Sequence, residues 1–303
     1  MNLQNKYRKQ GSVGIVRLIL IAFSMILLTS WAHKPFTLVV LGQSKNSGNE
    51  PSPVVVQKQR GDSGETFAHW CRTRASLNPE AKHTVEVLLK EAGTTECDVA
   101  NQRLSSLKKL YLSNNKISDI KPLESLTNLT ALTINFNPIS DIKPLESLTN
   151  LTALSLTDNK ISDIKPLKSL TNLNELTIIF NKISDIKSLE SLTNLTRLLL
   201  DYNKISDIQP LESLTKLTLL GLSNNQISDI KPLKSLTNLV GLELGNNKIS
   251  DIQPLESLTN LTRLFLEKNQ ISDIKPLESL TNLRYLKLYP QSNQKHQTAS
   301  ILE

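Results

Sequence analysis

The sequence has few of the residues on which most enzyme chemistry depends. Its 303 residues include four histidines and two cysteines, and aromatic side chains make up 4%. The long regular part of the chain, residues 107–290, contains neither type, since these residues are His33, His69, His83, His296, Cys71 and Cys97. A Ser/His/Asp or Cys/His set therefore cannot be built there, and no glycine-rich phosphate loop occurs. We predict a non-enzymatic protein that uses no cofactor.

Metal and nucleic-acid sites also lack support in the sequence. A zinc site needs three or four ligands, and two cysteines do not supply them. An aspartate recurs every 22 residues, but each copy brings one carboxylate and no companion ligands for Ca²⁺. The net charge of +7 includes four basic residues within the first 32, where there is no acid, so +3 remains for residues 33–303. We therefore expect neither a metal nor a nucleic-acid partner.

Residues 1–32 have the pattern of an export signal. Basic residues precede an apolar run from Leu18 to Leu28, and small residues stand at −3 and −1 of a cleavage point before His33. The run is short for a membrane span of roughly 20 residues, which favours cleavage. The alternative is an uncleaved signal anchor, because 13–32 is apolar apart from Arg17. In either case we expect a secreted or cell-envelope protein, which contacts the membrane only if the anchor is retained.

A flexible linker and a helical N-terminal cap are predicted next, over residues 33–64 and 65–106. Within the cap, Asn78 and Pro79 indicate a helix start, and Gly93 indicates its end. Cys71 precedes this helix and Cys97 follows it. In an exported chain we expect the two to form a disulfide, with two separate thiols as the alternative if residues 1–32 are not a signal.

Residues 107–290 repeat with a period of 22. The phrase SDIKPLESLTNL occurs unchanged at 118–129, 140–151 and 272–283. Counting from Leu107, each unit reads L-x-x-L-x-L-x-x-N-x-I-x-x-I-x-x-L-x-x-L. We predict a short strand centred on the fifth position of each unit, with all strands in one parallel sheet over a shared core. The aspartate of each phrase should cap a short helical turn.

The asparagine at the ninth position of each unit is expected to turn inward. Its amide can satisfy backbone groups in its own turn and in the neighbouring coil. Repeated along the chain, these side chains would form a buried ladder of Asn115, Asn137, Asn159, Asn181, Asn203, Asn225, Asn247 and Asn269.

The ten residues between the phrases vary, mainly where side chains should face outward from the sheet. Aromatic residues and arginines at such places resemble the anchors of protein interfaces. The predicted ligand-binding residues are Tyr111, Phe136, Glu175, Ile179, Phe180, Arg197, Leu199, Tyr202, Leu219, Glu243, Arg263, Phe265 and Tyr285. Drift at unconstrained surface positions is the alternative, but drift predicts mainly small polar residues.

The middle of this face should be apolar and hollowed. Five residues are expected to be neighbours in a patch, namely Ile179, Phe180, Leu199, Tyr202 and Leu219. Gly221, Gly241 and Gly245 should leave a depression beside it. The carboxylates of the same face, such as Asp201 and Glu243, are interpreted as charges of a binding surface, because no partner group for acid–base catalysis accompanies them.

The unit resembles the 22-residue leucine-rich-repeat class of bacterial internalins. It is also similar to the repeats of a regulatory subunit of protein phosphatase 1. The resemblance covers about 107–290 and implies an α/β fold, a right-handed curved solenoid with a parallel sheet on its concave face and short helical turns on its convex face. It also implies a protein ligand on the concave face and export by a signal peptide. Residues 291–303 form a polar tail, and no LPxTG wall-sorting motif is present.

Three functions remain open at this point. The first is an exported, monomeric recognition module with a protein ligand. The second is an intracellular regulator or adaptor that docks on an enzyme such as a protein phosphatase. The third is a structural envelope component without a specific ligand. Export separates the first from the second, since an intracellular regulator would have neither a cleaved signal nor a disulfide.

Overall fold

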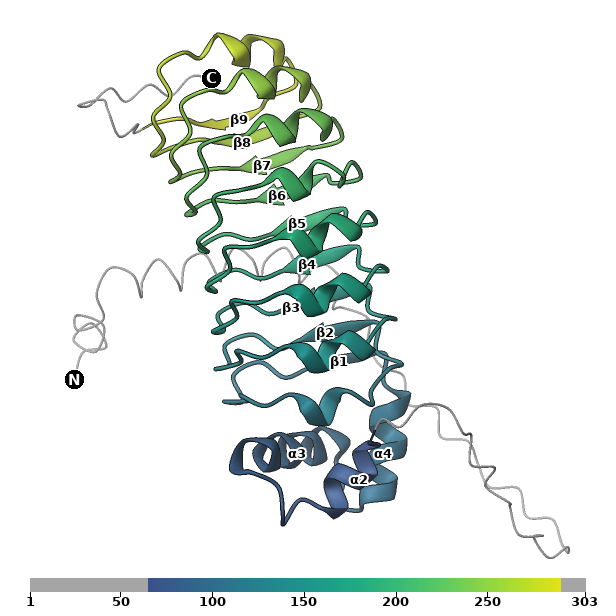
Figure 1. The fold of residues 1–303 in the computed structure, drawn as a ribbon. Helices are drawn as coiled ribbons and strands as arrows, with labels where there is room; N and C mark the ends of the chain where they lie inside the picture. Colours follow the sequence, from purple (N-terminus) through teal and green to yellow (C-terminus); the bar gives the residue numbers. More distant parts are fainter. Residues whose placement is uncertain (1–64, 290–303) are drawn as a thin grey trace, which may run out of the picture. The chain divides into compact units, whose positions relative to one another are not determined.

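The computed structural model describes residues 65–289 as three α-helices followed by a repeating β-solenoid (Figure 1). The predicted signal segment, the predicted linker and the predicted C-terminal tail lie outside the described residues. Within the described part, no helix is long and apolar enough to cross a membrane.

The helices α2 (Phe67–Arg72), α3 (Pro79–Ala92) and α4 (Cys97–Ser106) form the N-terminal cap. The helix α3 begins and ends where the sequence predicts. The Asn78 side chain accepts a hydrogen bond from the Ala81 backbone N–H at 2.7 Å, Pro79 opens the helix, and Gly93 ends it in the left-handed region at φ 63°. Cys71 and Cys97 form a disulfide that joins α2 to α4.

The cap covers the first coil of the solenoid. Val85 and Leu88 of α3 are fully buried in the same core as the repeat leucines. The Thr84 hydroxyl donates to the Asp119 carbonyl at 2.6 Å, and a ring nitrogen of His83 lies 2.6 Å from the Asn115 carbonyl. These contacts give backbone carbonyls of the first coil hydrogen-bond partners in the cap.

Nine three-residue strands pair in parallel and in sequence order, each shifted by one repeat from its neighbour (Figure 1). They are β1 (Lys109–Tyr111), β2 (Ala131–Thr133), β3 (Ala153–Ser155), β4 (Glu175–Thr177), β5 (Arg197–Leu199), β6 (Leu219–Gly221), β7 (Gly241–Glu243), β8 (Arg263–Phe265) and β9 (Tyr285–Lys287). The predicted strand centres were wrong by one residue, because each strand ends at the residue predicted as its centre. The chain soon turns away, since the eighth position has a positive φ in units one to eight.

Short 3₁₀ helices run along the opposite side of the coils (Figure 1). They are η3 (Lys121–Leu123), η4 (Lys143–Ser147), η5 (Lys165–Ser169), η6 (Lys187–Ser191), η7 (Gln209–Leu211), η8 (Lys231–Ser235), η9 (Gln253–Ser257) and η10 (Lys275–Ser279). The aspartate of each phrase lies just before such a helix. In η4, for example, the Asp141 carboxylate accepts from the Lys143 backbone N–H at 2.8 Å. The core lies between the sheet and these helices, where Ile120, Leu123 and Leu126 are at most 1% exposed.

The ninth-position asparagines make hydrogen bonds within and between coils. Asn159 is 8% exposed, and its amide nitrogen donates to the carbonyls of Ile134, Leu156 and Thr157 at 2.9, 3.1 and 3.3 Å. Its amide oxygen accepts from the Ile139 backbone N–H at 3.1 Å. Asn137, Asn247 and Asn269 are equally buried, whereas the other ladder residues are half-buried.

Further ladders, which the sequence did not suggest, connect the coils at the surface. In one coil, the Ser147 hydroxyl donates to the Glu124 carbonyl at 2.7 Å and the Asn150 amide to the Thr127 carbonyl at 2.9 Å. The same two bonds recur one coil later, from Ser169 and Asn172. These serine and asparagine side chains of the phrase therefore bond the backbone of the preceding coil. This gives a structural reason for the near-identity of the phrase from one copy to the next.

Candidate ligand-binding face

The predicted ligand-binding residues all lie on one face of the sheet, here called the sheet face. It consists of the third, fifth, seventh and eighth positions of each unit. Strands supply Tyr111, Glu175, Arg197, Leu199, Leu219, Glu243, Arg263, Phe265 and Tyr285, and the turns after the strands supply Phe136, Ile179, Phe180 and Tyr202. Strand alternation explains this placement, because the residues on either side of the fifth position, such as Leu110 and Leu112, are buried in the core.

The structure brings together the five residues expected as a patch. Ile179, Phe180 and Leu199 form a hydrophobic cluster separate from the main core, and Tyr202 and Leu219 pack against it. The rings of Phe180 and Tyr202 are stacked, with centroids 4.1 Å apart and an interplanar angle of 26°. We call these five residues the sheet-face cluster. Ile179, Phe180 and Leu199 are only 7–8% exposed, so the cluster is a small second core, with Tyr202 and Leu219 half-buried.

Other predicted residues lie apart from this cluster. Tyr111 on β1 and Tyr285 on β9 stand on the first and last strands and are 62% and 63% exposed. The Arg263 guanidinium lies over the Tyr285 ring, 6.0 Å from its centroid. The structure therefore places the aromatic residues of the face in separate groups rather than in one continuous patch.

The backbone at the eighth position is left-handed in units one to eight. The residues are Asn114, Phe136, Asp158, Phe180, Tyr202, Asn224, Asn246 and Lys268, with φ between 54° and 61°. Asparagine and aspartate tolerate this conformation, whereas it is strained for bulky side chains. Phe136, Phe180 and Tyr202 therefore occupy places where asparagine would fit the backbone better. Strain of this kind, about 1 kcal/mol or more per residue, is typical of functional sites.

The glycines do not leave the predicted depression, and this expectation was wrong. A Cβ on Gly221 would collide with the side chains of Asp201 and Leu199. A Cβ on Gly241 would lie 2.7 Å from Leu219, and one on Gly245 would lie 2.8 Å from the Glu267 carboxylate. Larger neighbouring side chains lean over each glycine and fill the space that its missing side chain leaves.

The seventh position has a structural role that the sequence did not reveal. Its polar side chains accept hydrogen bonds from the backbone N–H of the seventh residue in the next coil. Asn135 accepts from Thr157 at 2.8 Å, and Ser223 accepts from Gly245 at 3.1 Å. Asp201 likewise accepts from Ser223 at 2.8 Å. Part of the variation at this position therefore reflects alternative ways of satisfying the backbone. Its preference for Ser, Asn, Thr and Asp was the available signal.

Asp201 is the most perturbed acid of the sheet face. Its side chain is next to the cluster and it is 7% exposed. Burial, followed by repulsion from Glu243, raises the pKa of Asp201 to about 7, although hydrogen bonds from Ser223 and from its own backbone N–H oppose the change. Burial also raises the pKa of Glu243, against the attraction of Arg263 and Arg197. Glu267 pairs with Lys287 at 3.0 Å.

These groups do not form a recognisable catalytic or metal centre. Among residues 65–289, no three His, Cys, Asp or Glu side chains are grouped so that they could hold a metal ion. Asp201 bonds the backbone N–H and the hydroxyl of Ser223, and no histidine is present among residues 107–289 to complete a catalytic set with them.

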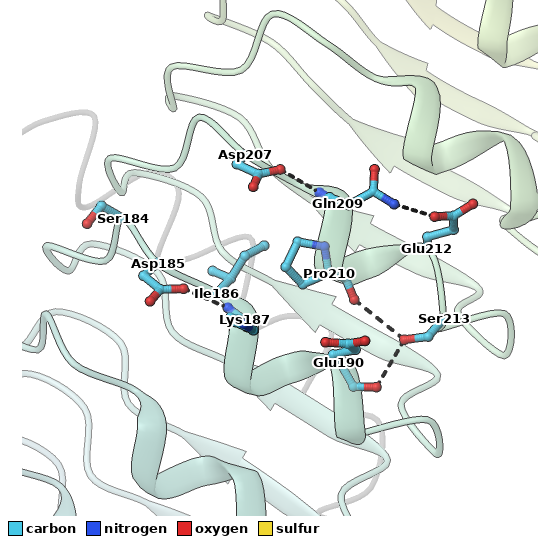
Figure 2. Close-up of a pocket in the computed structure, with 10 residues that line it drawn as sticks. All are labelled: Ser184, Asp185, Ile186, Lys187, Glu190, Asp207, Gln209, Pro210, Glu212 and Ser213. Atoms are coloured by element: carbon cyan, nitrogen blue, oxygen red, sulfur yellow. Dashed lines mark hydrogen bonds between the residues drawn. The ribbon is translucent and has the colours of Figure 1, made fainter.

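A hollow of about 730 Å³ lies away from the sheet face, between η6 and η7 (Figure 2). Figure 2 shows Asp185 and Asp207 hydrogen-bonded to the backbones of Lys187 and Gln209, as in the other coils. A smaller hollow of about 240 Å³ lies at equivalent residues two coils earlier, including Asp141 and Asp163. Since it recurs with the repeat, we interpret the hollow as a groove between successive 3₁₀ helices rather than as a ligand site.

Comparison with known proteins supports the repeat assignment. A family model described as leucine-rich repeats (two copies) matches residues 105–147, 149–191, 193–235, 215–257 and 259–298. A comparison with curated protein sequences gave no match.

Three solved structures illustrate what the chain is similar to. The internalin inlF of Listeria monocytogenes is 41% identical, with a TM-score of 0.61 over 63% of this chain and 57% of that one, so the chain spans little more than half of that internalin. Internalin C2 of the same species is 34% identical, with a TM-score of 0.65 over 71% of this chain and 96% of that one.

The third structure is similar in fold alone. It is the ectodomain of the Arabidopsis thaliana membrane receptor kinase GASSHO1/SCHENGEN3, in complex with Casparian strip integrity factor 2. It is 22% identical, with a TM-score of 0.55 over 63% of this chain and 25% of that one.

Proposed function

The chain belongs to the internalin-like leucine-rich-repeat proteins of bacteria, and from this premise we propose that it is an exported, non-enzymatic module that binds a protein ligand on its sheet face. The sheet-face cluster is the centre of the proposed site. The similar plant ectodomain was solved in complex with Casparian strip integrity factor 2, so a solenoid of this fold can bind a partner molecule.

The observation that carries the proposal is the aromatic character of the eighth position. The backbone there is left-handed, and Asn or Asp occupies it in four units, at Asn114, Asp158, Asn224 and Asn246. Phe136, Phe180 and Tyr202 accept strain that those residues would largely avoid. Unconstrained substitution at the eighth position would be expected to replace these aromatic residues by residues that fit the backbone better, such as Asn. Their presence at these strained positions supports a role in contact with a partner, for which aromatic side chains are the usual anchors.

We expect a probe on the sheet face to capture the ligand. A photo-reactive phenylalanine analogue replaces Tyr202 in one variant and Glu190 of η6 in the other, and both are irradiated with envelope and culture-medium proteins. The variant labelled at 202 should give a defined cross-linked product that the variant labelled at 190 does not give, because Glu190 is exposed on the opposite side. Identical products from both variants, or a product from position 190 only, would contradict the proposal.

The captured protein then allows a quantitative prediction. Tyr202→Asn should weaken its binding about thirtyfold, the loss typical of an interface anchor. Asn is the matched replacement, because Asn224 has the same backbone conformation in the next unit. Relief of the left-handed backbone should offset part of the stacking lost on Phe180, so the free energy of unfolding should fall by about 1 kcal/mol or less. Glu190→Ala is the binding control and should change the affinity less than about twofold. Equal affinities of the Tyr202→Asn variant and the unchanged protein, by titration calorimetry, would argue against the sheet face.

Export is proposed from the N-terminal pattern and from the Cys71–Cys97 disulfide. Disulfides persist in oxidising compartments and are rare in the cytosol, which disfavours an intracellular regulator. We predict that the mature chain begins at His33. N-terminal sequencing of protein from the envelope and the medium measures this directly. A chain that keeps residues 1–32 would indicate the uncleaved anchor if it is in the membrane fraction, and would oppose export if it is in the cytosol.

A further inference from the structure

We propose that the Cys71–Cys97 disulfide is a thiol–disulfide exchange site, at which a dithiol reductant attacks Cys97 and Arg74 stabilises the departing Cys71 thiolate. This inference does not depend on the proposed ligand-binding function. It rests on the surroundings of the two sulfur atoms.

The guanidinium of Arg74 contacts both sulfur atoms. Its Nη1 donates to the Cys71 carbonyl at 3.0 Å and lies 3.3 Å from Cys71 Sγ and 3.5 Å from Cys97 Sγ. The carbonyl bond fixes the guanidinium beside the disulfide. A disulfide sulfur is a weak acceptor, so these contacts contribute little in the oxidised protein. After reduction, the same N–H group would face a thiolate, and a charge-assisted bond is roughly twice as strong as a neutral one.

The two cysteines differ in accessibility, and this difference sets the direction of attack. Cys71 is fully buried in α2, whereas Cys97 is half-buried at the first residue of α4. The positive end of a helix stabilises a thiolate at that place. The N-cap residue Glu96 makes no side-chain capping bond, so it does not compete for the first backbone N–H groups. Asp98 would oppose a thiolate, but it forms an ion pair with Arg72.

The exchange is balanced as follows. A thiolate of the dithiol attacks Cys97 Sγ and forms a mixed disulfide, while the Cys71–Cys97 bond breaks and its electron pair passes to Cys71 Sγ beside Arg74. The second thiolate of the dithiol then attacks its partner sulfur in the mixed disulfide, which releases Cys97 as a thiolate. The dithiol is oxidised to a disulfide, and the protein is reduced by two electrons. Protons from the two reductant thiols balance the two protein thiols at neutral pH.

Reduction would remove the covalent cross-link between α2 and α4. The remaining contacts of this six-residue helix with the rest of the cap include the packing of its buried residues and a 3.2 Å bond from the Ala68 N–H to the Asn101 side chain. The exposed ion pair of Arg72 with Asp98 also joins α2 to α4. Because α2 is where the described fold begins, loss of the disulfide would loosen the start of the cap.

The test measures exchange in the full mature chain with dithiothreitol as the dithiol. Arg74→Ala should slow reduction about tenfold and shift the equilibrium about tenfold toward the disulfide, because the thiolate loses its charged donor. Arg74→Lys keeps the charge and should recover most of both effects. Lys82→Ala is the matched control, since it removes an exposed cation of the cap that has no described contact with either sulfur.

A second readout separates this role from support of the fold. In the reduced proteins, the rate of thiol alkylation by iodoacetamide should rise at a pH about one unit higher for Arg74→Ala than for the unchanged chain. A purely structural role would lower the melting temperature of the oxidised protein without this shift. Unchanged exchange rates, equilibria and alkylation profiles in Arg74→Ala would overturn the proposal, and so would equal effects of Lys82→Ala.

Discussion

Replacing Asp201 by Asn should stabilise the protein above pH 7 and change its stability little at pH 4. Asp201 is 7% exposed, and burial is the largest cause that raises its pKa from 3.8 to about 7. Asn has almost the same shape and can still accept the 2.8 Å bond from the Ser223 backbone N–H. It carries no charge, so the cost of burying a carboxylate disappears.

The direction of the pH dependence follows from the raised pKa. Below about pH 4 the carboxyl is protonated in both the folded and the unfolded chain and costs nothing. Between about pH 4 and pH 7 the unfolded chain has released the proton while the folded chain still binds it, so the free energy of unfolding falls as the pH rises. Above about pH 7 the folded chain has released this proton as well, so the free energy of unfolding falls no further from this cause. A change of about three pKa units corresponds to at most about 4 kcal/mol.

Urea denaturation at pH 4, 6 and 8 measures the effect. The difference between Asp201→Asn and the unchanged protein should grow with pH. Asp207→Asn is the matched control, because Asp207 is exposed and bonds the Gln209 backbone N–H in the repeated phrase. Asp207→Asn should not raise the free energy of unfolding at any of these pH values. If the free energies of unfolding of Asp201→Asn and of the unchanged protein differ by the same amount at all three pH values, the buried carboxyl does not cause the pH dependence.

The repeat made the positions of side chains predictable, because its period fixes both strand register and inward spacing. Parallel strands shifted by one repeat bring equivalent positions side by side, so Ile179, Leu199 and Leu219 could be expected near one another from their places in the unit. The helix α3 was predictable for a different reason, since Asn78, Pro79 and Gly93 act through local backbone chemistry.

Features that depend on how neighbouring side chains fill space were not predictable in this way. The filled glycine sites depend on the rotamers of Asp201, Leu219 and Glu267 in adjacent coils. The low exposure of Phe180 depends in the same way on its surroundings. The left-handed eighth position could have been inferred from its frequent Asn and Asp, but the three aromatic residues obscured that pattern.

Replacing Asn159 by Ala should lower the free energy of unfolding by about 3 kcal/mol or more, because several buried backbone groups lose their partner. The Ile139 N–H loses its acceptor, and the carbonyls of Ile134, Leu156 and Thr157 lose a donor. At 8% exposure, little water reaches the site to replace these bonds. Since the stability of a stacked array includes the contacts between neighbouring coils, the loss should weaken the attachment of the coils on both sides.

Asn150→Ala is the matched control, because it removes the same amide from an exposed place in the preceding coil. Its one described bond, 2.9 Å to the Thr127 carbonyl, lies where water can substitute, so the expected loss is about 1 kcal/mol or less. Guanidinium denaturation of both variants gives the comparison. A much larger loss for Asn159→Ala would assign inter-coil stability to the inner asparagines, whereas equal losses would mean that the inner and outer ladders hold the coils together equally.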